Sequence, residues 1–356
     1  MNTLAPTPAR PDDRIPHLRI RFAMPRDTRI GTWLLGTTAA EAVARVGLAY
    51  SICRHAQQAA SRTALEAAGS TLDADTAVQR HHAVRREWLR EHAANLMLAW
   101  PARLQESEEP ALVRALMQAV DGQTERESAM AAILQREVLG MPPATFLALD
   151  TRELQTWLDR APTPTARRLR RWRHGPAYPV ETPVLPALAE WSTATAAVLA
   201  SHMRDEPGFC LQPHWHGRPV EAGVWARQRG HPLLLAWRQL SASGPASRML
   251  ARLVELAQAA AGIFPLPVLR GWTLDAGTGL AAVETARGPL LHLARLHDGR
   301  VADYRVLAPT EWNFHPQGVL TQVASCVEPS RAEAAIAAWT LALDPCESCS
   351  VEVLDA

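Results

Sequence analysis

The sequence lacks most features that mark secreted, membrane-spanning or nucleic-acid-binding proteins. Its 356 residues include only five cysteines, an odd number that argues against a disulfide framework. There is no apolar run of about 18 residues, and the first 22 residues lack the apolar region of a secretory signal. With 37 basic and 36 acidic residues, the formal net charge of +1 gives no support for a nucleic-acid or anionic-membrane partner. We therefore expect a cytoplasmic protein without a membrane span.

Helical patterns dominate what is present. Apolar residues make up 47% of the chain, which is enough to bury a sizeable core. The segments 37–69, 77–100 and 246–261 are Ala-rich or amphipathic, as expected of helices. The Pro-rich segment 1–16 is predicted to be a flexible arm. The fold class predicted is mainly α with minor antiparallel β structure.

Strand patterns are fewer and shorter. The segments 17–22 and 28–36 both have short strand-like runs near the N-terminus. Residues 288–309 contain two alternating runs around Asp298-Gly299, a dipeptide that suits a type I′ turn. This pattern predicts a β-hairpin near the C-terminal end.

Three cysteines are candidate metal ligands. Cys346 and Cys349 have the spacing that lets two thiolates bind one metal, but an inert or redox pair has the same spacing. A four-thiolate zinc site would require a second pair, which the sequence does not contain. Cys53 is predicted to lie within a helix, where a lone cysteine is usually a small core residue. His55, two residues further on, is an alternative ligand, although positions i and i+2 of a helix face different ways.

Other cysteine and histidine positions carry weaker signals. His214 and His216, in "QPHWHGRP", could clamp a metal or could belong to a solvated loop. Cys210 and Cys326 have no partner pattern, so we expect both to pack in the interior.

The ends of the predicted hairpin carry hydrogen-bond donors. Arg287 enters one strand, while Pro309 and Thr310 follow the other. A hairpin brings such ends together, so a guanidinium and a hydroxyl would lie near one point. Donors beside thiolates suit a small anionic ligand on a metal, whereas ordinary hairpin-end polarity is the alternative interpretation.

These stretches together resemble the large subunit of [NiFe] hydrogenases. "TARGPL", "DGRVADY", "APTEWN" and "DPCESC" match, in order and spacing, the family's APRG-x-L stretch, hairpin, V-P-S/T-S/T-W-N stretch and DPCxxCxxH ending. The resemblance runs from about His17 to Cys349 and is most specific in the last 70 or so residues. It implies one large-subunit-like domain over 17–356, with a helical core and a hairpin near the C-terminus.

The resemblance also implies a reduced set of metal ligands. By position, Cys53 and Cys349 match the two cysteines that bridge nickel and iron in the family. Cys346 matches one nickel-only cysteine, while Tyr50 stands where the other would be, and Gln57 replaces the motif histidine. A complete nickel site is therefore not expected.

The surroundings of the family's iron are retained, but parts of its catalytic apparatus are not. By position, Arg287 and Thr310 would donate to the cyanides, and Pro309 and Leu290 would face the carbonyl. Ile15 replaces a proton-relay glutamate. Glu352 stands where the family has its terminal histidine, and we expect no peptidase-cleaved C-terminal extension.

The phrases "SIC-x-HAQ", "PTEWNFHP" and "DPC" resemble the HupK/HoxV group of hydrogenase accessory proteins. This resemblance implies a non-catalytic scaffold that transiently holds the Fe(CN)2(CO) fragment, for which soft thiolates are suitable ligands. Expected partners are HypC/HypD-like maturation chaperones, a dedicated small chaperone and the recipient large subunit. Two alternatives stay open: a metal-free docking protein for chaperones, and an active hydrogenase with an altered nickel site.

Overall fold

The computed structural model describes residues 19–23, 30–72, 76–121, 126–173, 180–242, 244–263, 268–346 and 350–354. Its strands form two antiparallel sheets, one of order β2-β3-β4-β5 and one two-stranded ribbon of β1 and β6. The strands are β1 (Arg19–Ala23), β2 (Leu269–Asp275), β3 (Thr278–Thr285), β4 (Gly288–His297), β5 (Arg300–Leu307) and β6 (Ser350–Leu354).

Helices make up most of the described chain. Those before the large sheet are α1 (Ile30–Leu34), α2 (Ala39–Ala49), α3 (Arg54–Ala67), α4 (Ala77–Ala94), η1 (Asn95–Ala99), α5 (Trp100–Arg103), α6 (Pro110–Asp121), α7 (Arg126–Ile133), η2 (Leu134–Leu139), α8 (Pro143–Leu147), α9 (Thr151–Arg160), α10 (Pro164–Arg173), η3 (Leu188–Glu190), α11 (Thr193–Asp205), α12 (Val224–Gln228), α13 (Pro232–Leu240) and α14 (Pro245–Ala260). Those after it are α15 (Pro309–Asn313), α16 (Val319–Cys326) and α17 (Pro329–Leu343).

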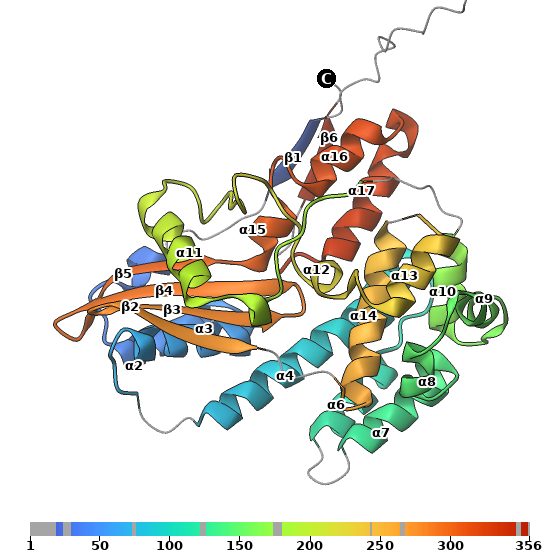
Figure 1. The fold of residues 1–356 in the computed structure, drawn as a ribbon, viewed down its shortest axis with the longest axis horizontal. Helices are drawn as coiled ribbons and strands as arrows, with labels where there is room; N and C mark the ends of the chain where they lie inside the picture. The colour runs from blue at the N-terminus through green and yellow to red at the C-terminus, as the bar shows by residue number, and fades with distance from the viewer. Residues whose placement is uncertain are drawn as a thin grey trace, which may run out of the picture.

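The four-stranded sheet lies between helices. Helices α2 and α3 cover one face and α11 lies against the other (Figure 1). The approach of α3 to β3 is close, because a Cβ on Gly279 would lie 2.2 Å from the carbonyl oxygen of Ala64. A glycine is therefore required at this point of the strand. The packing fixes the C-terminal end of α3 next to the sheet.

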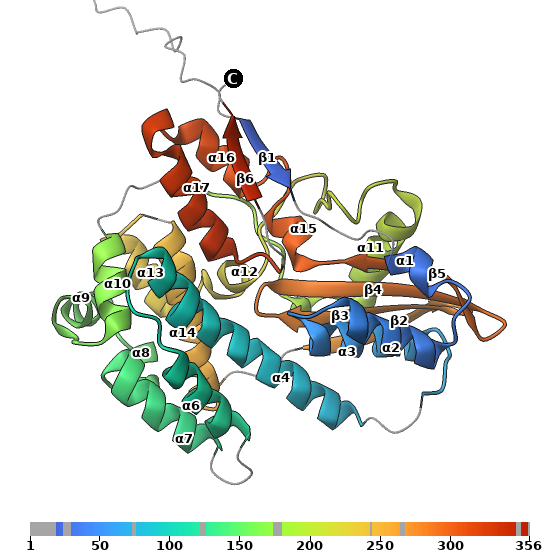
Figure 2. The ribbon, with the colours of Figure 1, turned by 180° about the vertical axis from the view of Figure 1, so that it is seen from behind.

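The second part of the molecule is a group of helices around α14. This helix is buried along almost its whole length and contacts α4, α7, α8, α10, α12, α13 and α17 (Figure 1). Helices α4 and α17 extend from this group toward the sheet (Figure 2). Side chains from both parts therefore meet where α3, α4 and α17 approach the sheet.

The fold class predicted from the sequence is confirmed: the chain is mainly helical with antiparallel β structure. The hairpin predicted within 288–309 is present as β4 and β5, and Asp298 and Gly299 both have the positive φ of a type I′ turn. The predicted strand within 28–36 is wrong, because the chain forms helix α1 there. Gly31 of α1 lies against the Tyr304 carbonyl oxygen, where a Cβ would come within 2.4 Å. Strands β2 and β3, which extend the hairpin to a four-stranded sheet, were not predicted.

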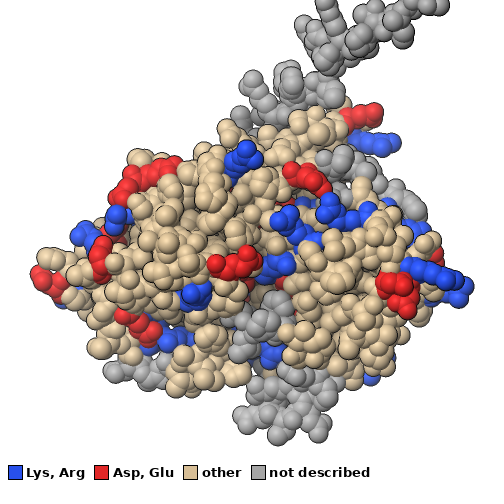
Figure 3. Space-filling view, in the orientation of Figure 1, with Lys and Arg blue, Asp and Glu red and all other residues tan. Residues whose placement is uncertain are grey.

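The predicted arm 1–16 lies outside the described residues. Among those that are described, no helix is both long and apolar enough to cross a membrane. On the face drawn in Figure 3, basic and acidic side chains lie interspersed among uncharged ones, in line with the near balance of charge.

Candidate metal centre

Cys53 lies at the N-terminal end of α3, where the sequence had suggested the middle of a helix. The chain leaves α2 at Ala49 and begins α3 only at Arg54, so Cys53 is the N-cap residue. Its side chain makes no capping hydrogen bond. The Glu87 carboxylate from α4 takes that role, accepting from the N–H groups of His55 at 3.0 Å and Ala56 at 2.8 Å. The Cys53 thiol, which is 8% exposed, is left available for other partners.

Cys346 approaches Cys53 from the other end of the chain. Helix α17 ends at Leu343, and Asp344 closes it in a left-handed conformation (φ 58°) that aspartate adopts more readily than most residues. Pro345 then prevents the helix from continuing. This turn brings the Cys346 Sγ atom to 3.6 Å from the Cys53 Sγ atom.

Arg287 lies on the two-residue turn between β3 and β4. The hydroxyl of Thr285 accepts from the Arg287 N–H at 3.2 Å and donates to the carbonyl of Gly288 at 2.7 Å. From outside, the Asn313 side chain donates to the Arg287 carbonyl at 3.0 Å. Gly223 packs against that carbonyl so closely that a Cβ would lie 2.6 Å from its oxygen. The turn, and with it the start of the Arg287 side chain, is held from three sides.

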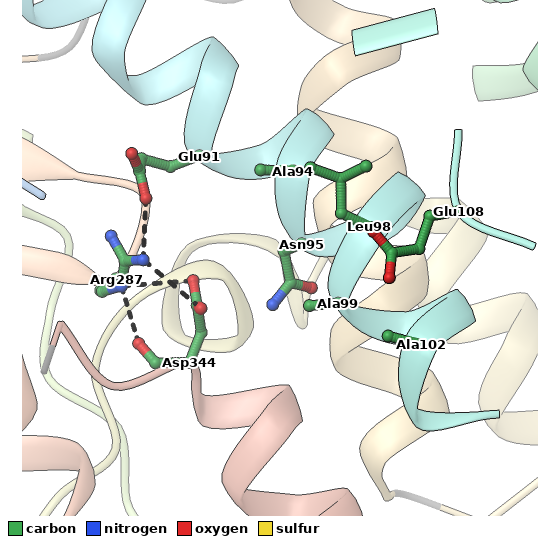
Figure 4. Close-up of a pocket in the computed structure, with 9 residues that line it drawn as sticks. All are labelled: Glu91, Ala94, Asn95, Leu98, Ala99, Ala102, Glu108, Arg287 and Asp344. Carbon is green, nitrogen blue, oxygen red and sulfur yellow. Dashed lines mark hydrogen bonds and ion pairs between the residues drawn. The ribbon is translucent and has the colours of Figure 1, made fainter. Parts of the chain in front are cut away.

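The Arg287 guanidinium connects the thiols to two carboxylates. Its Nη1 atom lies 3.8 Å from the Cys53 Sγ atom, and its Nε atom donates to the Asp344 carbonyl at 2.7 Å. Its Nη2 atom donates to Glu91 at 2.8 Å and to the Asp344 carboxylate at 3.4 Å (Figure 4). Arg252 forms a further ion pair with Asp344, at 3.1 Å. The buried cation is thus fixed by charge-assisted hydrogen bonds and aimed at Cys53.

The other residues predicted around the iron fragment lie in the same region. Thr310, in the first turn of α15, accepts a hydrogen bond from the Cys346 N–H at 3.3 Å. Pro309 begins α15 and is buried, with φ suited to a helix start. Leu290 on β4 is buried in the same apolar cluster as Cys53. The predicted convergence of the hairpin ends is therefore present, since β4 and β5 pair from Leu291 and Leu307 onward.

The two thiols have opposite acid–base tendencies. A hydrogen bond from the Cys53 thiol lowers the pKa of Cys346 to about 7, against the effect of burial, and Arg287 and Thr310 lower it further. The hydrogen bond to Cys346, together with burial, raises the pKa of Cys53 well above its usual value. Burial alone would lower the pKa of Arg287, but Asp344, both sulfurs and Glu91 raise it. Cys346 is therefore the more acidic thiol of the pair, beside a permanent cation.

A cavity of about 860 Å³ opens onto the thiol pair. Cys53, Cys346 and Thr310 contribute to its wall, as does Gln57. Behind Gln57, its side-chain oxygen lies 2.8 Å from the Nε2 atom of the buried His292. A second, smaller cavity of about 320 Å³ lies on the other side of Arg287, walled by α4 and η1 (Figure 4).

Several predicted residues are placed elsewhere. Cys349 and Ile15 lie outside the described residues, and for Glu352 only its backbone, in β6, is described. The His55 side chain is exposed, whereas Cys53 is buried. Cys326 is exposed at the end of α16, so its predicted burial is wrong.

The remaining cysteine and the two loop histidines also differ in their surroundings. Cys210 is partly buried against an apolar cluster and lines the large cavity, in agreement with the predicted packing. His214 contacts Glu206, while His216 is exposed. The two histidines are therefore not arranged to bind one metal together.

The geometry of the described thiols fits a shared metal. Two thiolates bound to one ion at about 2.3 Å have their sulfurs about 3.3–3.8 Å apart for bond angles between square and tetrahedral. The observed separation of 3.6 Å lies in that range. Soft sulfur donors beside fixed hydrogen-bond donors suit a soft or strong-field metal fragment carrying anionic ligands.

Three carboxylates that organise this centre were not predicted as part of it: Glu87, Glu91 and Asp344. Asp344 belongs to the quoted "DPC" motif, so its position was visible although its role was not. Glu87 and Glu91 lie in "REWLREHA", one helical turn apart. That spacing places both on one face of α4, but only the fold shows that this face meets α3 and Arg287.

Comparison with known proteins points to hydrogenases and their formation. Residues 238–352 match the family model described as nickel-dependent hydrogenase. Among solved structures, the chain is similar to an NAD+-reducing [NiFe]-hydrogenase in the H2-reduced state, with TM-score 0.52, 16% identity and coverage of 89% and 90% of the two chains. It is also similar to the Dm. baculatum [NiFeSe]-hydrogenase, with TM-score 0.53, 13% identity and coverage of 91% and 92%. These likenesses show the fold.

Curated relatives match over most of their length. The chain is 30% identical to the hydrogenase expression/formation protein HoxV of Cupriavidus necator over 292 residues, 74% of each chain. It is 30% identical to HupK of Azotobacter vinelandii over 348 residues, 95% of this chain and 94% of that one. HupV of Azotobacter chroococcum is 30% identical over 339 residues, 91% of this chain and 90% of the other. The chain therefore belongs to the HoxV, HupK and HupV family of hydrogenase expression/formation proteins, accessory homologues of the [NiFe] hydrogenase large subunit.

Proposed function

We propose that the protein takes part in hydrogenase formation as a non-catalytic scaffold that transiently holds the Fe(CN)2(CO) fragment. The names of its relatives support the general role, since they are hydrogenase expression/formation proteins. The observation that carries the finer proposal is the pair of thiols at 3.6 Å, with the Arg287 guanidinium 3.8 Å from one sulfur and Thr310 bonded beside the other.

In this proposal, Cys53 and Cys349 ligate the iron and Cys346 assists. Arg287 and Thr310 donate hydrogen bonds to the cyanides, and the apolar Pro309 and Leu290 surround the carbonyl. A guanidinium and a hydroxyl are donors suited to anionic ligands, and a carbonyl ligand favours apolar neighbours. Tyr50, which lines the cavity where a fourth thiolate would be, leaves the ligand set short for nickel.

The same proposal covers the protein's partners and surroundings. HypC/HypD-like chaperones and a dedicated small chaperone would deliver or receive the fragment in the cytoplasm, and the hydrogenase large subunit would be the recipient. The large cavity supports this, because it gives the thiol pair an opening through which a small fragment can be loaded. Hydrogen cleavage is not part of the proposed role, since the family's relay glutamate is replaced at Ile15.

Infrared spectroscopy of anaerobically purified protein tests this function. Bound carbonyl and cyanide absorb where proteins do not, so the proposal predicts their bands in the wild-type sample, with iron and without nickel by elemental analysis. Cys53→Ala should remove the bands. Cys210→Ala is the matched control, because Cys210 lines the same cavity but lies outside the thiol pair, and it should keep them.

Two outcomes would contradict the proposal. Wild-type protein without any such bands would favour the metal-free docking protein, and stoichiometric nickel with hydrogen uptake would favour an active enzyme. Bands that persist in both Cys53→Ala and Cys349→Ala would show that the ligand assignment is wrong.

A further inference from the structure

Helix α11 and the loop after it bring two imidazoles to one carboxylate. His202 lies in the last turn of α11, Glu206 is its C-cap residue, and His214 comes from the following loop. The His202 Nδ1 atom lies 2.9 Å from one Glu206 carboxylate oxygen, and the His214 Nε2 atom lies 3.1 and 3.2 Å from the two. One donor atom from each residue lies within 4.8 Å of the other two.

Phe209 orients both imidazoles. Its ring stacks on His202 with centroids 5.1 Å apart and planes at 18°, and it makes a T-shaped contact with His214 at 5.2 Å and 89°. Phe209 itself is buried and packs at 6.3 Å against Trp312 of α15. The two imidazoles therefore pack on a buried aromatic ring, which reduces the conformational freedom that a ligand would otherwise have to remove.

Two of the three donor separations fit a metal ion, and the third, between the two imidazoles, is within 4.8 Å. Nitrogen and oxygen ligands at about 2.0–2.2 Å from one ion lie about 3.0–3.5 Å apart in octahedral or tetrahedral arrangements. The two carboxylate-to-imidazole distances are already close to this range. The side chains of His202, Glu206 and His214 are 38%, 41% and 28% exposed, so an ion can reach them from solvent.

We propose that His202, Glu206 and His214 form a metal site, separate from the cysteines, that binds one divalent first-row transition ion. Two imidazoles and one carboxylate suit zinc, cobalt, nickel or ferrous iron, and not calcium or magnesium, which prefer oxygen ligands alone. Three protein ligands leave at least one coordination position open to water or a further ligand. Glu206 also lines the cavity that contains Cys53 and Cys346, so the open position lies at the edge of the space used by the thiols.

Loading this site moves one proton on each imidazole. His202 donates to Glu206 through Nδ1, so an ion bound at Nδ1 displaces that proton, and Nε2 of the neutral ring becomes the protonated nitrogen. His214 Nδ1 accepts a hydrogen bond from the Gly217 N–H at 3.3 Å, so His214 Nε2 carries the proton and donates to Glu206. An ion bound at Nε2 displaces that proton, and Nδ1 of the neutral ring then becomes the protonated nitrogen. The Gly217 N–H must turn away, which an exposed glycine with φ 73° and no close neighbour allows.

The alternative role is a metal-free clasp, in which Glu206 only ties the loop to α11. Calorimetric titration of the full-length protein with Co²⁺ distinguishes the two. The site predicts saturation at one ion, with affinity reduced at least about 100-fold by His214→Ala or Glu206→Gln, since losing even an outer partner of a ligand costs 10–100-fold. His216→Ala is the matched control, because this exposed histidine belongs to the same loop, and it should change the affinity less than about twofold.

X-ray absorption of the loaded protein should show nitrogen and oxygen ligands without sulfur. Cys53→Ser should keep this ion even if it abolishes iron binding, so failure of the scaffold proposal and failure of this one are separable. No Co²⁺ binding by the wild type, equal binding by His214→Ala of unchanged circular dichroism, or sulfur in the first coordination sphere would each overturn the metal site and leave the clasp.

Discussion

The thiol centre and the histidine cluster border the same cavity but are built in contrasting ways. The first joins residues 293 positions apart, Cys53 and Cys346, and buries a guanidinium and two carboxylates around them. The second lies within 13 residues, His202 to His214, and is partly open to solvent. One offers soft sulfur in an environment of fixed charge, the other borderline nitrogen and oxygen in water.

In this protein the soft sulfur donor of Cys53 is buried, whereas the harder nitrogen and oxygen donors are partly exposed. Burying thiolates strengthens their electrostatic coupling to Arg287 and keeps competing water away from a strong-field fragment. An exposed cluster of imidazoles and a carboxylate exchanges its ion more readily, because solvent reaches its ligands directly. The two centres should therefore differ in kinetics and in metal preference, and variants of each should leave the other intact.

The largest difference should appear on chelation. Treating the loaded protein with excess EDTA should remove all Co²⁺ or Zn²⁺ from His202, Glu206 and His214, because the site is exposed. The carbonyl and cyanide bands should remain, since the proposal places the fragment on thiolates at a buried position. Elemental analysis and infrared spectra before and after treatment make the comparison. Loss of both metals together would mean that the centres are not independent.

The next largest effect should follow loss of the buried cation. Arg287→Met leaves the carboxylates of Glu91 and Asp344 without their shared partner, and we expect a loss of about 3–5 kcal/mol in the free energy of unfolding. Glu206→Gln is the corresponding change in the exposed cluster and should leave the unfolding midpoint nearly unchanged. Urea unfolding of both variants measures this. Equal destabilisation by the two variants would contradict the proposed difference in burial between the thiol centre and the histidine cluster.

Acid should lower the free energy of unfolding through His292, which lies behind Gln57 in the wall of the large cavity. Burial lowers the pKa of His292 from 6.5 to about 3, and its Nδ1 atom lies 2.7 Å from the Tyr304 hydroxyl. Below pH 6.5 the unfolded chain takes up a proton that folded His292 does not, so stability falls as pH falls. Between about pH 7.5 and pH 5 this amounts to about 2 kcal/mol, at roughly 1.4 kcal/mol per pH unit below the unfolded pKa.

Urea unfolding at both pH values tests this, and His292→Gln should reduce the loss by about the same 2 kcal/mol. His216→Gln, an exposed change near the histidine cluster, should leave the pH dependence as it is in the wild type. An unchanged pH dependence in His292→Gln would show that His292 is not the group responsible.

The smallest effect concerns the cap of α3. Glu87→Ala removes the acceptor of the His55 and Ala56 N–H groups and should cost about 1–2 kcal/mol. Because Cys53 lies at this helix end, the variant should also broaden the iron-fragment bands. Glu137→Ala, whose partner Arg136 is exposed, should change stability by less than about 0.5 kcal/mol. Thermal unfolding monitored by circular dichroism is sensitive enough to separate the two.

The sequence predicted elements with clear patterns better than those shaped by packing. The hairpin was predicted because Asp298-Gly299 and the alternating runs are local signals. Strand β3 was missed because it is buried on both faces, so its residues do not alternate, and because Gly279 interrupts it. That glycine is there for α3 to approach, which no local pattern shows.

The residues of the candidate sites also differ in how well the sequence predicted them. Cys53, Cys346, Arg287 and Thr310 were candidates from cysteine spacing and hairpin-end chemistry, and the family resemblance then suggested a role for each. The described structure brings them together. The mid-helix position predicted for Cys53 was wrong, because the cap of α3 is supplied from another helix. One of the three members of the histidine cluster, His214, was noticed as part of an H-x-H pair, but His202 lies twelve residues earlier in the chain.

The Arg287 side chain also controls where small molecules can reach the sulfurs. Its side chain lines the 320 Å³ cavity beside α4, and its Nη1 atom touches Cys53, which lines the 860 Å³ cavity. The Arg287 side chain thus separates the two cavities. A short side chain at this position would leave an opening, through which gases or small oxidants entering beside α4 would meet the sulfurs from behind, on the side that the cation now closes.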